Sequence, residues 1–233
     1  MRAESMRTGL EFPARGAGWL NAGWVVLLLL LAGAAPPAAG RDWTPPDRGR
    51  ALEQTRSTQI DQRRLAYGRL AEIGTMEDVP VLLAALWDEE DLIRGMAEIS
   101  VWGIWMRAGD SNVDPLFQAS IALITVNEPQ AAIEKLNDVI ALRPEFAEAW
   151  NRRGDAWEQA GDDARALADY TQAIDLNPYH FGALESCGRI WFERRENRKA
   201  AEFFRRAVEI NPNLWNVVDV LRKLETVLEN DRI

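Results

Sequence analysis

The amino-acid sequence predicts an all-α fold, a right-handed solenoid built from stacked helical hairpins. Three observations support this prediction: apolar residues recur at helical spacing from residue 51 onward, small, aromatic and proline residues recur every 34 positions between residues 113 and 214, and turn residues separate the helical stretches. The chain has 233 residues and is 47% hydrophobic, so it can bury a core of this kind.

Residues 1–34 have the pattern of an export leader. Three arginines and two glutamates come before or at the start of an apolar stretch that runs from Trp19 to Ala35, and Ala32-Gly33-Ala34 offers a small-residue cleavage pattern. Residues 16–35 also supply about the 20 residues that an uncleaved membrane anchor needs. Both alternatives remain open. Assuming a bacterial source, the first predicts a periplasmic protein and the second a protein anchored to the inner membrane that faces the periplasm.

The next residues, 35–50, are interpreted as a proline-rich linker, because four prolines among them disfavour a helix. Residues 51–110 lie outside the 34-residue register but keep helical spacing, and Thr75 with Asp78 three residues later is a helix-start signal. The run from Val79 to Ala97 resembles a HEAT-type helical pair. We therefore expect a helical segment that packs end-on against the first repeat and extends the solenoid.

The 34-residue period has landmarks that fall at fixed places in each unit. A unit with this pattern cannot cover its own apolar face, so copies of it stack. In the second unit we expect helices at 147–160 and 163–176, with a turn at Gly161 between them and Pro178 ending the second helix. The aligned triplets include Pro144, Pro178 and Pro212; Ala132, Ala166 and Ala200; Ser120, Gly154 and Gly188; and Leu136, Tyr170 and Phe204.

On these residues the chain resembles the tetratricopeptide repeat (TPR) family. The units would be 113–146, 147–180 and 181–214, followed by a capping helix over 215–230. The first unit departs from the pattern, with Ser120 in place of glycine and Leu123 in place of an aromatic residue. The second unit is the fullest match, through Trp150, Gly154, Trp157, Ala166, Tyr170, Ala173 and Pro178. The resemblance implies a non-catalytic scaffold that binds a peptide segment of a partner protein in a groove lined by the first helix of each unit.

The positions of these first helices that lie between the packing landmarks are mainly acidic, with apolar islands. They favour a partner segment that bears lysine or arginine beside apolar residues, although the carboxylates could also be no more than a solvated helix face. The TPR family includes a subset of domains that clamp a C-terminal carboxylate with lysines and asparagines. Only Asn151 and Arg189 could serve such a clamp here, so we do not expect one. The predicted peptide-binding residues are Asp114, Phe117, Ile121, Glu148, Asn151, Asp155, Glu158, Glu185, Arg189 and Phe192.

Composition argues against most other functions. A net charge of -9 repels nucleic acids and anionic lipids, so membrane contact is expected only through the N-terminal segment. With one histidine and one cysteine, the chain lacks the usual metal sets and catalytic sets, and we expect no cofactor, metal, catalytic residue or small-molecule substrate. His180 is predicted to be a solvated loop residue, Cys187 a small apolar group between helices, and five tryptophans core residues. They are Trp102, Trp105, Trp150, Trp157 and Trp191.

Two rival functions stay open beside the adaptor. One is a permanent structural subunit of an envelope complex, which predicts a large exposed apolar patch. The other is an enzyme of unfamiliar type, which predicts a deep pocket with converging carboxylates of perturbed pKa.

Overall fold

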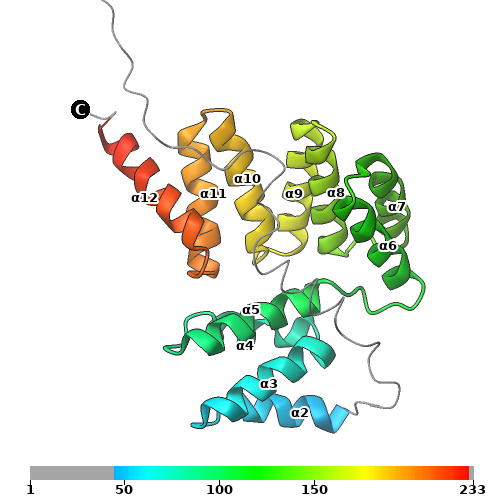
Figure 1. Ribbon diagram of the computed structural model, residues 1–233, viewed down its shortest axis with the longest axis vertical. Helices are drawn as coiled ribbons and strands as arrows, with labels where there is room; N and C mark the ends of the chain where they lie inside the picture. Colours follow the sequence, from blue (N-terminus) through cyan, green and yellow to red (C-terminus); the bar gives the residue numbers. More distant parts are fainter. Residues whose placement is uncertain (1–44, 231–233) are drawn as a thin grey trace, which may run out of the picture.

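A computed structural model describes residues 45–230, and this part of the chain is helical, with no strand (Figure 1). The predicted leader and most of the predicted linker fall within residues 1–44, outside the described residues. Within 45–230 no helix combines the length and the apolar character that crossing a bilayer requires. The described helices form two groups, an N-terminal module (residues 45–105) and a repeat arc (residues 113–230).

The N-terminal module consists of α2 (Pro45–Gln54), α3 (Ile60–Ile73), the short 3₁₀ turn η1 (Met76–Asp78), α4 (Val79–Ala85) and α5 (Asp91–Trp105). The repeat arc consists of α6 (Val113–Thr125), α7 (Pro129–Leu142), α8 (Ala147–Gln159), α9 (Asp163–Leu176), α10 (Phe181–Glu193), α11 (Asn197–Ile210) and α12 (Trp215–Asn230).

The predicted linker extends too far, because α2 already begins at Pro45. Proline is tolerated in the first turn of a helix, where its missing N–H would have no partner anyway and its fixed φ suits the helix. Asp47 in the same turn complements the positive end of the helix dipole. Residues 45–50 are therefore helix rather than extended chain.

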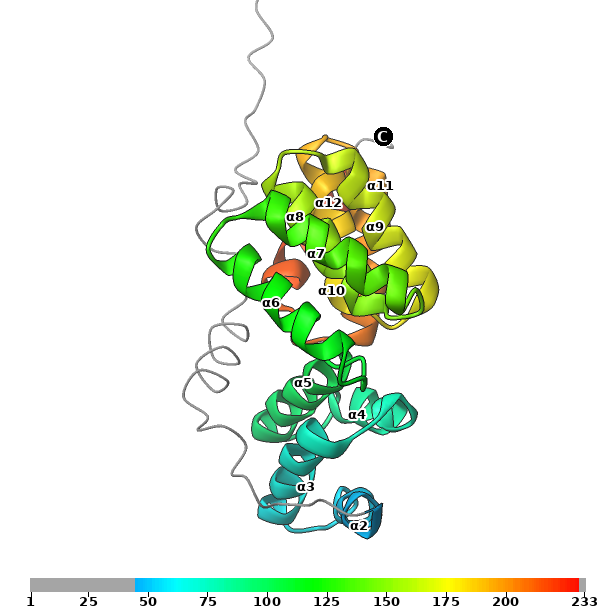
Figure 2. The same cartoon turned by 90° about the vertical axis from the view of Figure 1, so that its right-hand side faces the viewer.

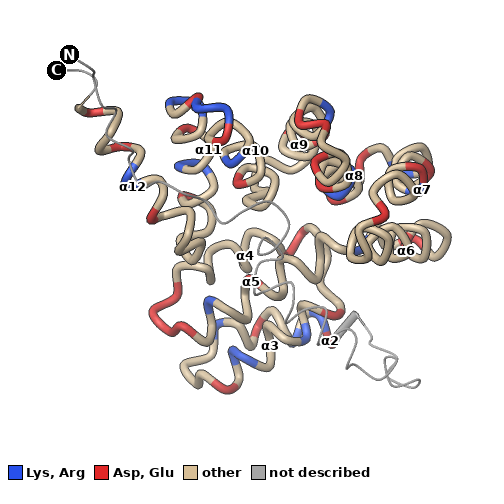
Figure 3. Tube along the Cα trace, turned by 45° about the horizontal axis from the view of Figure 1, so that its top comes forward, with Lys and Arg blue, Asp and Glu red and all other residues tan. Residues whose placement is uncertain are grey.

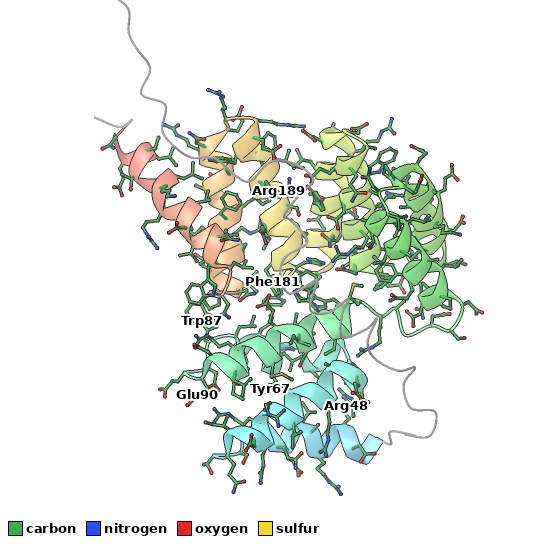
Figure 4. All side chains as sticks on the ribbon, in the orientation of Figure 1. Arg48, Tyr67, Trp87, Glu90, Phe181 and Arg189 are labelled. Carbon is green, nitrogen blue, oxygen red and sulfur yellow. The ribbon has the colours of Figure 1, made fainter. Side chains whose placement is uncertain are left out.

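The helix-start signal at Thr75 is confirmed. Thr75 and Asp78 form a capping box, in which the Thr75 amide donates to Asp78 Oδ2 at 2.9 Å. Asp78 is buried and also accepts from Arg48 Nε of α2 at 2.8 Å, so the same carboxylate joins α2 to η1. Arg48 is labelled in Figure 4.

The repeat arc follows the predicted 34-residue register. In the second unit, α8 and α9 agree with the predicted helices to within one residue. The turn inside each hairpin places a residue in the left-handed region at the same register position, with φ of 59° at Asn127, 81° at Gly161 and 61° at Arg195. Glycine adopts this conformation without strain and asparagine at little cost, so Arg195 carries a local backbone cost that Gly161 does not.

A pair of residues of matched size sets the contact between the two helices of each hairpin. A Cβ atom on Gly154 would lie 2.6 Å from the Tyr170 ring, and one on Gly188 would lie 2.5 Å from the Phe204 ring. The first unit has Ser120 at the glycine position and the smaller Leu136 at the aromatic position, both fully buried. Serine is larger than glycine and leucine is smaller than an aromatic residue, so the two changes compensate each other, as dense packing requires.

The tryptophans divide into two groups. Trp102 and Trp105 on α5 are buried, as predicted. Trp150, Trp157 and Trp191 are only half-buried, and a cation lies over each indole: Arg153 over Trp150 at 4.7 Å, Arg165 over Trp157 at 4.3 Å and Lys199 over Trp191 at 4.2 Å. The landmark tryptophans therefore cover the outside of the hairpins rather than fill their centres.

The capping helix and the buried thiol agree with the sequence predictions. α12 spans Trp215–Asn230, and its buried face consists of Val217, Leu221 and Leu224. Cys187 is fully buried in the main core cluster, and burial raises the pKa of its thiol to about 12.

The N-terminal module does not extend the solenoid end-on, and that expectation is wrong. α5 runs along the side of the second and third units, beneath the loops that join them (Figures 1 and 2). The Trp102 ring meets the Phe181 ring edge-on at 5.2 Å, and Arg94 Nε donates to Asn213 Oδ1 at 2.9 Å. Packing along this side buries the aromatic rings of Trp102 and Trp105, which favours it through the hydrophobic effect. The resemblance of residues 51–110 to a HEAT pair stays a prediction.

Candidate functional site

The first helices of the three units, α6, α8 and α10, carry the predicted peptide-binding residues on what we call the first-helix face. Five of the ten are partly exposed there, and the other five are buried, so the expectation of an accessible row is wrong for those five. The partly exposed residues are Asp114, Ile121, Asp155, Glu158 and Phe192; the buried ones are Phe117, Glu148, Asn151, Glu185 and Arg189.

On α6 the predicted residues have structural roles. Phe117 is fully buried and packs edge-on against Phe146 with 4.9 Å between ring centroids, which excludes it as an exposed anchor in this conformation. Asp114 accepts hydrogen bonds from the backbone amides of Ala108 at 2.7 Å and Asp110 at 3.2 Å. Its carboxylate therefore holds the connection between the N-terminal module and the first repeat.

On α8 and α10 the charged residues form one continuous chain, which we call the α8–α10 network. It begins at Glu148, which is 1% exposed: His180 Nε2 lies 2.6 Å from Glu148 Oε2, and Arg152 Nε donates to Glu148 Oε1 at 2.6 Å. Arg152 continues the chain by donating through Nη1 to Asp155 Oδ2 at 2.6 Å. A buried carboxylate is tolerable only with such partners.

The second half of the network reaches α10. The Tyr170 hydroxyl lies 2.8 Å from Asp155 Oδ1 and 3.1 Å from Glu158 Oε2, and because it carries a single proton it donates to only one of these carboxylates at a time. Glu158 also accepts hydrogen bonds from both terminal nitrogens of Arg189, and Arg189 Nη1 lies 3.6 Å from Glu193 Oε1. Figure 4 labels Arg189 on α10.

The two carboxylates nearest Arg152 titrate in opposite directions. Burial acts to raise the pKa of Glu148, but the charge of Arg152 and the hydrogen bond from His180 outweigh it and leave that pKa below its usual range. Burial raises the pKa of Asp155. The charge of Arg152 acts to lower this pKa, but the negative charges of Glu158 and Glu148 add to the effect of burial. Burial also holds the pKa of Tyr170 well above its ordinary value. Glu148 therefore keeps its negative charge to a lower pH than Asp155 does.

His180 differs from its predicted state, which was that of a solvated loop residue. It is fully buried rather than solvated, and its ring stacks on Trp105 at 4.7 Å. Its Nδ1 accepts from the backbone amide of Ala183 at 3.1 Å, which caps the start of α10, so the ring proton lies on Nε2 and is donated to Glu148. A signal was available in the register, because the equivalent positions, Phe146 and Leu214, are apolar and at least partly buried.

The network carries an excess of negative charge. Its four carboxylates (Glu148, Asp155, Glu158 and Glu193) face two guanidinium groups (Arg152 and Arg189), which balance about half of the carboxylates. Figure 3 shows acidic and basic positions side by side along α8. Among residues 45–230 no group of three histidine, cysteine, aspartate or glutamate side chains is arranged to hold a metal ion. The partly exposed carboxylates leave the face moderately acidic.

The fold and this face define a class: an α-solenoid of paired helices that presents the first helix of each pair. The family model for the tetratricopeptide repeat matches residues 117–180 and 164–214, so this part of the chain consists of TPR units.

Two curated relatives illustrate the likeness. A TPR repeat-containing protein of Rhizobium etli is 28% identical over 108 residues, which is 46% of this chain and 53% of that protein. Tetratricopeptide repeat protein 6 of Homo sapiens is 32% identical over 82 residues, covering 35% of this chain and 16% of that protein. The chain thus matches about half of the length of the first relative and much less of the second.

Two solved structures of TPR proteins are similar to this chain at low identity. The first TPR domain of Spaghetti, bound to an HSP90 peptide, is 21% identical, with a TM-score of 0.48, covering 52% of this chain and 96% of that one. YrrB, described as a TPR protein with an unusual peptide-binding site, is 18% identical, with a TM-score of 0.44, covering 75% of this chain and 97% of that one.

Proposed function

We propose that this protein is a non-catalytic interaction scaffold that holds a peptide segment of a partner protein against the first-helix face. The observation that carries the proposal is a strip of Asp155, Glu158, Phe192 and Glu193 on α8 and α10, which is accessible in part and whose three carboxylates belong to the α8–α10 network. The strip lies in the part of the chain that the tetratricopeptide repeat model matches.

The chemistry of this strip favours a partner segment with arginine or lysine beside an apolar side chain. Phe192 supplies an apolar contact on the same turn of α10 as Glu193, whose side chain is 24% exposed. The arginines within the network are already bound to Glu148, Asp155 and Glu158, so they compete little for an incoming carboxylate. A cationic segment is therefore the better electrostatic match.

We further propose that the scaffold acts outside the cytoplasmic membrane, either released into the periplasm or anchored to the inner membrane. The support is the pattern of residues 1–34, in which arginines lead into an apolar stretch with a small-residue cleavage pattern. Fusion of the chain to a reporter phosphatase that is active only after export tests this. Loss of activity when residues 1–34 are deleted would support the proposal, and an inactive fusion of the full chain would contradict it.

Fluorescence anisotropy with two synthetic peptides tests the binding proposal. One peptide alternates arginine with leucine, and the other alternates glutamate with leucine. We expect the first to bind, with an affinity that falls as salt rises, and the second not to bind. Phe192→Ala should weaken binding about tenfold, as truncation of an interface anchor does, and Glu193→Gln about two- to fivefold, as for an exposed charge.

The matched control is Glu209→Gln on α11, the same substitution at an exposed position away from the first-helix face. It should leave the affinity unchanged. Equal binding of both peptides, or equal weakening by Glu193→Gln and Glu209→Gln, would show that the strip is not the binding site.

A second candidate, a permanent subunit of a larger assembly, is favoured by apolar side chains at the junction of the module with the third unit. Trp87 and Trp215 are 62% and 67% exposed, and between them the Asn213 amide donates to the Leu86 carbonyl at 3.0 Å. Trp87 is labelled in Figure 4. Sedimentation of the purified chain distinguishes the two, since an adaptor stays monomeric and a lone subunit self-associates.

A further inference from the structure

A cavity lies where the end of α5 meets the loops that follow α7 and α9. Its volume is about 180 Å³. It is separate from the exposed strip proposed above, although Glu148 and His180 at the buried end of the α8–α10 network form part of its wall. The residues that matter for its chemistry are Ile104, Trp105, Arg143, Phe146, Leu176 and Asn177.

Two buried donors in the wall have no partner. Trp105 is 3% exposed, and its indole Nε1 makes no hydrogen bond within the described residues. Asn177 is 4% exposed; its Oδ1 accepts from the Tyr179 amide at 3.2 Å, which fixes the orientation of the amide group, and its Nδ2 likewise makes no hydrogen bond there. Both groups can only donate, so what satisfies them must bring an acceptor.

The protein places a carboxyl group beside an equivalent pair one repeat later. Asn211 is 34 residues after Asn177, and Trp102 is one helical turn before Trp105 on α5. The Glu98 carboxyl of α5 lies beside both: burial raises its pKa, and hydrogen bonding by Asn211 and Trp102 opposes that rise, although Asn211 Nδ2 makes no bond of standard geometry. Within residues 45–230 no carboxyl group accepts a hydrogen bond from Trp105 Nε1 or Asn177 Nδ2.

The charge and size of the cavity narrow the class of ligand. Arg107, which donates to the backbone carbonyls of Ala71 and Gly74, contributes positive charge, while Glu148 is paired with Arg152 and Glu145 with Arg143. The volume is close to that of the roughly 150 Å³ cavity that accommodates one benzene molecule in another protein. The rest of the wall, including Ile104, Phe146 and Leu176, is apolar. A carboxylate on a compact apolar body fits these features.

We propose that this cavity binds a small free monocarboxylate with a ring or branched apolar body, whose oxygens accept from Trp105 Nε1 and Asn177 Nδ2. The site joins the N-terminal module to the first two repeats, and its ligand would stabilise that junction. The proposal is independent of peptide binding at the first-helix face.

Titration of the full chain with benzoate, followed in the nitrogen–proton NMR spectrum, tests the proposal. We expect the Trp105 indole resonance to shift saturably and the thermal midpoint to rise, while toluene, which has the same ring and no acceptor, gives no indole shift of that kind. Trp105→Phe and Asn177→Asp should each weaken benzoate binding about tenfold or more, because each removes a hydrogen bond to a charged group. Asn177→Asp keeps the acceptor for the Tyr179 amide and so preserves the turn.

Trp102→Phe is the matched control, since it makes the same change on the same helix at a ring that does not line the cavity. It should bind benzoate within twofold of the parent chain. If Trp105→Phe does not fold, the parent indole shift and Asn177→Asp still decide the question. Absence of a saturable Trp105 shift at millimolar benzoate, or unchanged affinity in Asn177→Asp, would overturn the proposal.

Discussion

Replacing Gly188 with serine tests whether one residue pair sets the spacing of each helical hairpin. A Cβ at this position would lie 2.5 Å from Cδ1 and 2.6 Å from Cε1 of Phe204. Carbon atoms in contact prefer about 3.5–4.0 Å, so either the ring or the whole of α11 must move by about 1 Å. Overpacking of this kind costs about 1–3 kcal/mol of the free energy of unfolding, and the better helix propensity of serine recovers well under 1 kcal/mol of it.

The first repeat supplies the compensating change. Its Ser120 packs in register with Leu136, so the double variant Gly188→Ser with Phe204→Leu rebuilds that pair in the third unit. Phe204→Leu alone should cost about 1–2 kcal/mol through the cavity that it leaves. Because leucine makes room for the serine, the double variant should be less destabilised than the sum of the singles by about 1 kcal/mol or more.

Urea unfolding, followed by far-ultraviolet circular dichroism and by tryptophan fluorescence, measures these differences. Coincident curves from the two probes would justify a single free energy for the repeat arc. Gly95→Ser on α5 is the matched control, since a Cβ there meets nothing within 4 Å, and it should change stability by no more than about 0.5 kcal/mol. Additive effects of Gly188→Ser and Phe204→Leu, within about 0.5 kcal/mol, would refute the size-matching argument.

Three further predictions follow from local features. Arg195→Gly should raise the urea midpoint by the equivalent of about 0.5–1 kcal/mol, because it relieves a left-handed residue, whereas Gly161→Ala should lower it; a loss of stability in the first would refute the strain argument. Because the pKa of Glu148 is lowered in the folded chain, this residue should stabilise the fold above its unfolded pKa of about 4.3, and the stabilisation should be lost as pH falls through the folded pKa. Glu148→Gln should therefore make the urea midpoint depend less steeply on pH in the acid range. An unchanged slope would contradict the assignment. With a thiol pKa of about 12, folded Cys187 should react with iodoacetamide at pH 8 about 1,000-fold more slowly than the urea-unfolded chain, so rapid labelling of the native protein would show that the thiol is not buried.

The repeats were predictable because their constraints are local and occur three times. Gly154 and Pro178 each have a physical role that favours that residue type, and the same residue types recur 34 residues later as Gly188 and Pro212. Agreement between copies distinguishes a pattern of this kind from chance. Helix ends, turns and the small-to-large contacts therefore followed from the sequence.

The position of the N-terminal module was not predictable by the same means. It depends on single contacts between distant parts of the chain, such as Arg94 with Asn213, 119 residues apart. No periodicity encodes a contact of that kind, and α5 is amphipathic enough to pack on several surfaces. The burial of Trp102 and Trp105 was predicted, but not the residues that bury them.

The sequence does not predict which of the candidate site residues are buried. It places them on the first helices α8 and α10, yet spacing alone does not show that Arg152 lies between Glu148 and Asp155 and pairs with both. His180 was misjudged because a histidine before a helix is usually solvated, whereas here its ring replaces an apolar residue of the register. Mutual neutralisation is a property of three-dimensional neighbours.

The length of α5 also limits how many repeats can lie between its two contact points. Arg94 meets the loop after the third unit and Trp105 meets the loop after the second, and eleven helical residues span about 16 Å, the advance of roughly one unit along the stack. Insertion of an extra unit between these loops would leave one end of α5 without its docking point. The number of repeats between these two loops is therefore constrained by the length of α5. Repeats added after α12 would leave both contacts of α5 unchanged.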